Sequence, residues 1–147
     1  MVKVCGIDPG KSGGLAINDG ESIRVFKFTD LTLPDIADLI RENVSSIDKV
    51  YLEKVGAMPK QGVSSTFKFG LGYGHLQGVL DALLIPYELV SPQIWQKSLN
   101  CLSGGDKNVT KAKAQRLFPM VDKITHAKAD ALLITEYGNR KENKEKS

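Results

Sequence analysis

The stretch that decides the fold is VKVCGIDPGKSGGLAIN, residues 2–18. Its apolar run from Val2 to Ile7 predicts a short buried strand that ends on Asp8. Proline and glycine then turn the chain, and residues 15–17 resume a strand pattern. The sequence therefore predicts a hairpin that places a carboxylate at the end of its first strand.

The rest of the chain alternates strand and helix patterns. The predicted elements after the hairpin are a strand at 23–26, a helix from Pro34 to Val44, a strand at 49–53, a long helix from a cap at Ser64 or Ser65 to Leu84, a strand at 87–90, and helices at 92–99, 107–118 and 126–137. Three antiparallel strands, a crossover helix and two further strands describe an α/β protein. We expect a five-stranded mixed sheet flanked by helices.

Length and composition indicate one globular domain. The chain has 147 residues, of which 41% are hydrophobic and 25% charged, so it can bury one core. We expect residues 1–138 to form this domain and residues 139–147 to be a charged, disordered tail. Cys5 and Cys101 are too few for a disulfide framework. No apolar run approaches the roughly 20 residues that cross a bilayer, so we expect an intracellular protein with no membrane partner.

The net charge of +3 is unevenly distributed along the chain. Residues 91–147 carry a net charge of +5, whereas residues 1–90 carry −2. This asymmetry is typical of an acidic metal site beside a phosphate-binding surface. The basic residues that we expect to bind nucleic acid are Lys97, Lys107, Lys111, Lys113 and Arg116.

Four residues could form one chemical site. Asp8 and Glu53 each end an apolar strand, and each alone could simply mark the point where a strand reaches solvent. His126 and Asp130 are four residues apart and therefore share one face of a predicted helix. If this helix faces the two strand ends, three carboxylates and one imidazole meet.

Such a set favours Mg²⁺, with Mn²⁺ able to substitute, over structural zinc, because its donors are mostly hard oxygens. Two such ions about 4 Å apart can activate water and stabilise the leaving oxygen of a phosphodiester. We therefore predict a site for two ions, with Asp8, Glu53, His126 and Asp130 as ligands, and no nucleotide cofactor.

Several motifs occur together in a characteristic order. They are Gly-Ile-Asp-Pro-Gly at 6–10, the strand-ending Glu53, the segments at 58–65 and 91–95, and Ala-Asp-Ala-Leu-Leu at 129–133. In this order the chain resembles RuvC-type Holliday junction resolvases of the RNase H-like superfamily, especially the compact forms encoded by phages. The resemblance covers residues 2–138. It implies an RNase H-like fold and, if a phage encodes the chain, a location in the host cytoplasm.

The resemblance also assigns roles to residues. Asp8, Glu53 and Asp130 match the metal-binding acids of the family, and His126 falls near its fourth ligand. Several members place that ligand three residues before the last aspartate, where this chain has Ala127. Lys107 matches a basic residue near the scissile phosphate, so it joins the four ligands as a predicted catalytic residue. A second family lysine falls at Gln96 or Lys97, which leaves its role open.

One departure concerns how the DNA junction is opened. Cellular members carry an aromatic residue three positions after the strand-ending glutamate, where this chain has Gly56. Met58, Phe67 and Phe69 are candidates to hold the junction core instead.

The implied activity is resolution of four-way DNA junctions, and possible activity on other branched DNA, by paired phosphodiester hydrolysis. Paired cuts by one site per chain imply a homodimer of two-fold symmetry. Gly70, Gly74 and Gly78 recur every four residues on the long helix and could allow close approach of a second subunit. The alternative is that this stripe packs on the subunit's own sheet, and the sequence does not separate the two.

Other functions would place different demands on the same residues. Gly10-Lys11-Ser12 suggests a P-loop, but that motif requires glycine where Cys5 stands and a helix where a strand is predicted. An actin-like or sugar-kinase ATPase would need a second lobe. A nuclease that acts on structured RNA and a non-catalytic module that binds branched DNA remain alternatives, because phosphate contacts and metals would serve RNA equally well.

Overall fold

The computed structural model describes residues 1–56 and 61–144 of the chain. Its strands are β1 (Val4–Asp8), β2 (Gly14–Asn18), β3 (Ile23–Lys27), β4 (Lys49–Glu53) and β5 (Tyr87–Val90). They form one sheet in the order β3-β2-β1-β4-β5. The pairs β1–β2 and β2–β3 are antiparallel, whereas β1–β4 and β4–β5 are parallel. The predicted five-stranded mixed sheet is confirmed.

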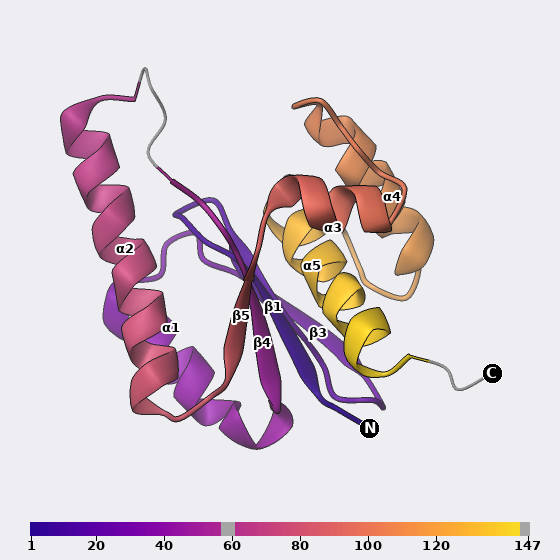
Figure 1. Cartoon of the computed structure of the whole chain (residues 1–147), viewed down its shortest axis with the longest axis horizontal. Coiled ribbons are helices and arrows are strands. Elements are labelled where there is room, and N and C mark those ends of the chain that lie inside the picture. Colours follow the sequence, from indigo (N-terminus) through magenta and orange to yellow (C-terminus); the bar gives the residue numbers. More distant parts are fainter. Residues whose placement is uncertain (57–60, 145–147) are drawn as a thin grey trace.

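Helices cover both faces of the sheet (Figure 1). Their bounds are α1 (Leu33–Glu42), a short 3-10 turn η1 (Val44–Ser46), α2 (Val63–Ala82), α3 (Pro92–Ser98), α4 (Lys107–Leu117) and α5 (His126–Glu142). One layer holds α1 and α2, and the other holds α3, α4 and α5 (Figure 1). In the described part of the chain, no helix combines the length and the apolar character that crossing a membrane would require.

The alternation of side chains along the strands divides the core into two halves. Val4 of β1 and Tyr51 of β4 pack with α5, whereas Ile7 and Leu52 pack with α1 and α2. Because Asp8 is an even number of residues from Val4, and Glu53 from Tyr51, both carboxylates face the α5 layer. The pleat of the sheet thus selects the face on which the site is built.

The turn between β1 and β2 depends on glycine. Gly10 has φ of +106°, a conformation that side chains rarely adopt. A Cβ at Gly13 would overlap the carbonyl oxygen of Asp8. The turn therefore closes tightly against the end of β1, and this fixes the position of Asp8 as the last residue of the strand.

The long helix α2 begins differently from the prediction. Its N-cap is Gly62, which has no side chain to accept a hydrogen bond, so the predicted caps Ser64 and Ser65 are wrong and both residues lie inside the helix. Its buried residues are Leu76 and Leu80, in the C-terminal half. The N-terminal half has little contact with the core, and Val63 and Phe67 there are 88% and 67% exposed.

The central helix α5 lies very close to the sheet. A Cβ at Gly6 of β1 would overlap the backbone nitrogen of Thr135, and one at Gly138 would overlap the ring of Tyr51. The Thr135 hydroxyl is buried and hydrogen-bonds the carbonyl oxygens of Ala131 (2.7 Å) and Ala16 (3.2 Å). Glycine on both elements thus permits a backbone approach that fixes the height of α5 over β1.

The C-terminal segment is more ordered than predicted. We expected a tail from residue 139, but α5 continues to Glu142. Lys141 pairs with Glu88 of β5 at 2.5 Å, and Lys49 of β4 pairs with Glu142 at 2.9 Å. These ion pairs hold the last helical turn against the sheet, so the predicted boundary of the tail is wrong by several residues.

The two ends of the described chain are joined by one side chain. Asn143 accepts a hydrogen bond from the Val2 backbone nitrogen through Oδ1 (2.7 Å) and donates one to the Val2 carbonyl oxygen through Nδ2 (2.8 Å). The start of β1 and the end of α5 consequently lie on the same side of the molecule (Figure 1).

Candidate active site

Two carboxylates lie side by side at the edge where β1 and β4 end. The parallel register pairs Ile7 with Leu52, so Asp8 and Glu53 are the next residues of their strands. Both face α5, as the alternation of side chains requires. The convergence of these two strand ends, predicted from the sequence, is confirmed by this register.

The third carboxylate comes from α5. Asp130 lies one turn after His126, the first residue of the helix, and both side chains are close enough for the His126 charge to lower the pKa of Asp130. Asp130 is partly buried, whereas His126 is exposed. The predicted helical face therefore exists and points Asp130 at the strand ends, with His126 at its outer margin.

The electrostatics show that the three carboxylates act on one another. Burial, followed by the charges of Glu53 and Asp130, raises the pKa of Asp8 well above its usual value. Burial also raises the pKa of Glu53 to about 7, and the Asp130 charge contributes in the same direction. The pKa of Asp130 is raised by burial as well. Three partly buried like charges create a strong demand for a cation.

Lys107 supplies part of that positive charge. It is the first residue of α4, and its charge lowers the pKa of Asp8, Glu53 and Asp130. It remains exposed, so its ammonium group is free to meet a phosphate. The predicted position of Lys107 at the site is therefore consistent with its location at the start of α4.

Two residues that sequence reasoning did not place in the site support its carboxylates. Trp95 of α3 is fully buried and donates a hydrogen bond from Nε1 to Oε2 of Glu53 at 2.9 Å. Thr110 of α4 is also buried; its hydroxyl donates a hydrogen bond to the Lys107 carbonyl oxygen (3.2 Å) and lies near enough to Asp130 to lower the pKa of that carboxyl. Both contacts favour the ionised carboxylate. In the sequence, Trp95 belongs to the segment 91–95, which contributed to the family resemblance. Nothing in the sequence assigned a role to Trp95 or to Thr110.

The other predicted basic residues lie farther along the α3–α4 layer. Lys97 is exposed in the last turn of α3. Lys113 and Arg116 lie near Cys101, where their charges lower its pKa against the larger, raising effect of burial. Lys111 is partly buried on α4. These four residues extend the positive charge of Lys107 along one layer and remain predicted DNA contacts.

Two of the three candidates for holding a junction core, Phe67 and Phe69, lie on α2. Phe67 is 67% exposed, and Phe69 stacks on Tyr73 with ring centroids 6.2 Å apart. Tyr73 in turn donates a hydrogen bond to the Glu53 carbonyl oxygen (3.1 Å). A Cβ at Gly56 would meet no atom within 4 Å, and Met58 lies outside the described residues. Phe69 and Tyr73 of α2 are thus tied to the end of β4.

The donor set fits hard divalent cations, because partly buried carboxylates gain most from such an ion where neighbouring carboxylates raise their pKa, as they do for Asp8 and Glu53. As the side chains stand, no group of three or more His, Cys, Asp or Glu residues among positions 1–56 and 61–144 could hold a metal ion. Binding would therefore require the carboxylates to turn toward a common point. Metal binding by these residues stays a prediction.

Replacing Trp95 with phenylalanine tests its support of Glu53. The change keeps an aromatic ring in the core but removes the Nε1 donor, which lies 2.9 Å from Glu53 Oε2. Loss of a hydrogen bond to a metal-binding carboxylate typically lowers metal affinity or activity about 10- to 100-fold. We expect Trp95→Phe to need correspondingly more Mg²⁺ for half-maximal cleavage. Recovery of the rate at high Mg²⁺ would separate this effect from a folding defect, and an unchanged Mg²⁺ requirement would contradict the role.

Comparison with known proteins identifies the fold. Two structures of Thermus thermophilus RuvC superpose on nearly the whole chain. One, in complex with a Holliday junction substrate, has a TM-score of 0.68 and 15% identity, and the alignment covers 98% of this chain and 97% of that one. The other has a TM-score of 0.66 and 18% identity, with 96% and 97% covered. No protein-family model and no curated protein matches the sequence. The predicted RuvC-like, RNase H-like fold is confirmed.

Proposed function

We propose that the chain is a metal-dependent endonuclease that resolves four-way DNA junctions. The observation that carries the proposal is the convergence of Asp8, Glu53 and Asp130 from three separate elements at one end of the sheet, beside Lys107. A RuvC structure with the same fold is bound to a Holliday junction, which supports this choice of substrate. Activity on other branched DNA belongs to the same proposal.

The residues divide the work between them. Asp8, Glu53 and Asp130, with His126 at the margin, would hold two Mg²⁺ or Mn²⁺ ions, which when bound supply an activated water and stabilise the leaving oxygen. Trp95 holds one oxygen of Glu53, and Thr110 lowers the pKa of Asp130. Lys107 binds the phosphate beside the carboxylates. The phosphodiester and the ionised carboxylates are both negative and repel each other. This lysine and the metal ions together offset the repulsion, so that the phosphodiester can approach the site.

The direct test compares substrates and metals. The protein is incubated with a four-way DNA junction, a linear duplex of the same sequence and a structured RNA, each with Mg²⁺, Mn²⁺ or Ca²⁺. We expect paired cuts in the junction alone with Mg²⁺ or Mn²⁺, and binding without cutting with Ca²⁺, whose looser coordination holds the reacting oxygens less well. Preferential cutting of the RNA would favour the RNA nuclease, and binding without cutting in every metal would favour a non-catalytic module.

Replacing Lys107 with alanine separates a catalytic lysine from a general phosphate contact. Lys107 is the lysine whose charge acts on all three carboxylates. We expect Lys107→Ala to lower the cleavage rate more than the affinity for the junction. Lys113→Ala is the matched control, since Lys113 lies near Cys101. That control should mainly weaken binding and flatten the log–log salt dependence by about 0.9 per lost contact. Equal effects of both changes would remove Lys107 from the site.

The homodimer is proposed to form through α2. The alternative that the glycine stripe packs on its own sheet is wrong, because a Cβ at Gly70, Gly74 or Gly78 would meet no atom within 4 Å. The same helix exposes Phe67 and Leu71, which are 67% and 54% exposed. A two-fold axis across this helix would cover these side chains and pair two sites for cuts on opposed strands.

Light scattering tests this assembly. We expect a mass of about twice 16.1 kDa, and a monomer for Gly74→Asp, since like charges brought together across an interface cost several kcal/mol. A mixed dimer with one Asp8→Asn subunit should nick only one strand. A wild-type monomer that still makes paired cuts would exclude the dimer.

A further inference from the structure

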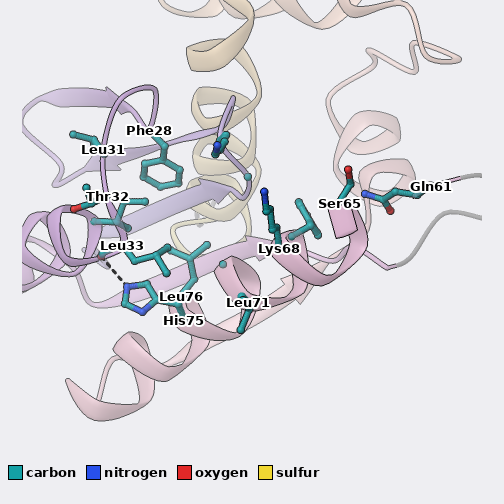
Figure 2. A pocket seen from close by; sticks show the side chains of 15 residues that line it. Phe28, Leu31, Thr32, Leu33, Gln61, Ser65, Lys68, Leu71, His75 and Leu76 are labelled. Carbon is teal, nitrogen blue, oxygen red and sulfur yellow. Dashed lines mark hydrogen bonds between the residues drawn. The ribbon is translucent and has the colours of Figure 1, made fainter. Parts of the chain in front are cut away.

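A groove of about 700 Å³ lies on the face of the sheet opposite the carboxylates. Its walls are the N-terminal half of α2 on one side and the segment from Phe28 to Ile36 on the other. The hydrogen bond from His75 Nε2 to the Leu33 carbonyl oxygen (2.8 Å) joins the two walls at one end (Figure 2). The volume lies within the range of about 300–1,000 Å³ that is typical of small-ligand sites.

The groove opens beside the candidate active site. Gly10 and Lys11 line it, and Gly10 follows Asp8 by two residues, which separates their Cα atoms by at most about 7 Å. Phe69 lines the same end, and its ring lies 3.3 Å from the position of a Cβ on Gly10. A nucleic acid strand that leaves the carboxylates across this turn therefore reaches the groove within one or two nucleotides, since duplex DNA rises about 3.4 Å per nucleotide.

The charges around the groove are complementary to a phosphate. Its lining contains Lys11 and Lys68 and no acidic residue. Neither lysine forms an ion pair with any residue in the described ranges. Figure 2 shows the Lys68 side chain rising from α2 among the residues that line the groove. Because the rest of the N-terminal part of the chain is net acidic, two unpaired lysines at the mouth of one groove are a local exception.

The interior suits a flat, partly polar group. Phe28, Ile36 and Leu76 form apolar walls, and Thr32 and Ser65 add hydroxyl groups. A nucleobase has an apolar face and a polar edge, and burying it against apolar and aromatic side chains stabilises it outside the stack. An uncharged lipid or an apolar peptide would match the walls but not the two lysines.

We propose that this groove binds the base of an unstacked nucleotide next to the scissile phosphate, with the phosphate of that nucleotide between Lys11 and Lys68. The inference rests on the proposed function and extends it, because it gives the enzyme a second contact by which it can distinguish a branch point from continuous duplex. Unstacking is least costly where pairing is already interrupted, so a branch point is the favoured substrate.

Gly72 allows the groove to be filled without disturbing the fold. It lines the groove, and a Cβ at this position meets no atom within 4 Å. Gly72→Leu places a branched side chain in the groove, whereas Gly72→Ala adds one methyl group and leaves it open. Both changes improve helix propensity, so the alanine variant is a matched control.

The experiment places 2-aminopurine, whose fluorescence rises when it unstacks, at successive positions around the branch point of a four-way junction, with Ca²⁺ present. Wild type and Gly72→Ala should raise the fluorescence at one position beside the cut, and Gly72→Leu should not. Gly72→Leu should also weaken junction binding by roughly tenfold, the value of about one base stack. Lys68→Gln should reduce the salt dependence of binding in the same assay.

The outcomes separate the two proposals. Cutting of the junction without a fluorescence change at any position would overturn the groove proposal and leave the proposed function intact. A fluorescence change that Gly72→Leu retains would also overturn it. If Gly72→Leu instead halves the molecular mass, the groove holds a second copy of the chain and not a base. A wild-type protein that neither binds nor cuts the junction would overturn both.

Discussion

Asp8→Asn is expected to lower the rate of junction cleavage by about 10³-fold, because metal ions contribute several kcal/mol of transition-state stabilisation and each 1.36 kcal/mol is about tenfold in rate. The change removes one charge from the carboxylate set at the end of β1 and keeps the shape of the side chain. Binding in Ca²⁺ should change little, since phosphate affinity comes mainly from lysines. Single-turnover cleavage and equilibrium binding measure the two effects separately.

The same substitution should stabilise the metal-free protein. Burial and neighbouring carboxylates raise the pKa of Asp8, and burial raises that of Glu53 from 4.5 to about 7. When the pKa of a carboxyl is higher in the folded than in the unfolded protein, the folded protein loses stability as the pH rises from the unfolded-state pKa through the folded-state pKa. Wild type without metal should therefore lose stability between pH 4.5 and about 7.

Thermal unfolding in EDTA provides the measurement. Above the Glu53 pKa of about 7, Asp8→Asn should have a higher Tm than wild type, and Mg²⁺ should raise the Tm of wild type more than that of the variant. Asp48→Asn is the control, since Asp48 is exposed and lies at the opposite end of the sheet from Asp8. Cleavage within tenfold of wild type would remove Asp8 from the site, and an unchanged Tm would show that the carboxylates do not repel one another.

Gly6→Ala should have the largest effect on folding. The added Cβ would overlap the backbone nitrogen of Thr135, which cannot move without shifting α5 from the sheet. Overpacking of this kind costs about 3 kcal/mol, and more where backbone must move. For a chain of this size such a loss corresponds to about 10 °C in Tm. Because α5 carries Asp130, the variant should also lose activity at temperatures where it remains folded.

Gly72→Ala, which lies outside the glycine stripe of the proposed dimer, is the matched control for this substitution. A Cβ at Gly72 meets no atom within 4 Å, and the residue lies inside α2. The same chemical change should therefore raise stability by about 1 kcal/mol, the difference in helix propensity. Urea unfolding of both variants gives the comparison. A Gly6→Ala protein as stable as wild type would show that α5 can rise over β1 without cost.

The strands and the carboxylate positions could be predicted from the sequence because the spacing of nearby residues specifies them. The apolar run before Asp8 and the one before Glu53 each end a strand, and the parallel register then brings the two residues together. The four-residue spacing of His126 and Asp130 likewise requires only a helix. These patterns were enough for the sheet and for the carboxylates.

The features that were missed depend on contacts between distant segments. Trp95 reaches Glu53 over 42 positions of sequence, and no local pattern indicates that its indole nitrogen needs a partner there. The last turn of α5 is held by Glu88 and Lys49, which belong to the sheet, so composition alone suggested a solvated tail. The groove beside Gly10 lies between α2 and the segment from Phe28 to Ile36, two parts of the chain that are far apart in the sequence.

The link between Asn143 and Val2 bears on how the protein can be rearranged and tethered. Since one amide side chain bonds both backbone groups of Val2, the two ends of the described chain are held together next to the start of the central strand β1. A short flexible linker could join them in a circular permutant, with new ends opened at the exposed residue Leu84, whose φ of +59° marks a strained turn. Such a permutant, or a surface anchor placed at this junction, would leave the carboxylates at the far end of β1 and β4 accessible to a large branched substrate.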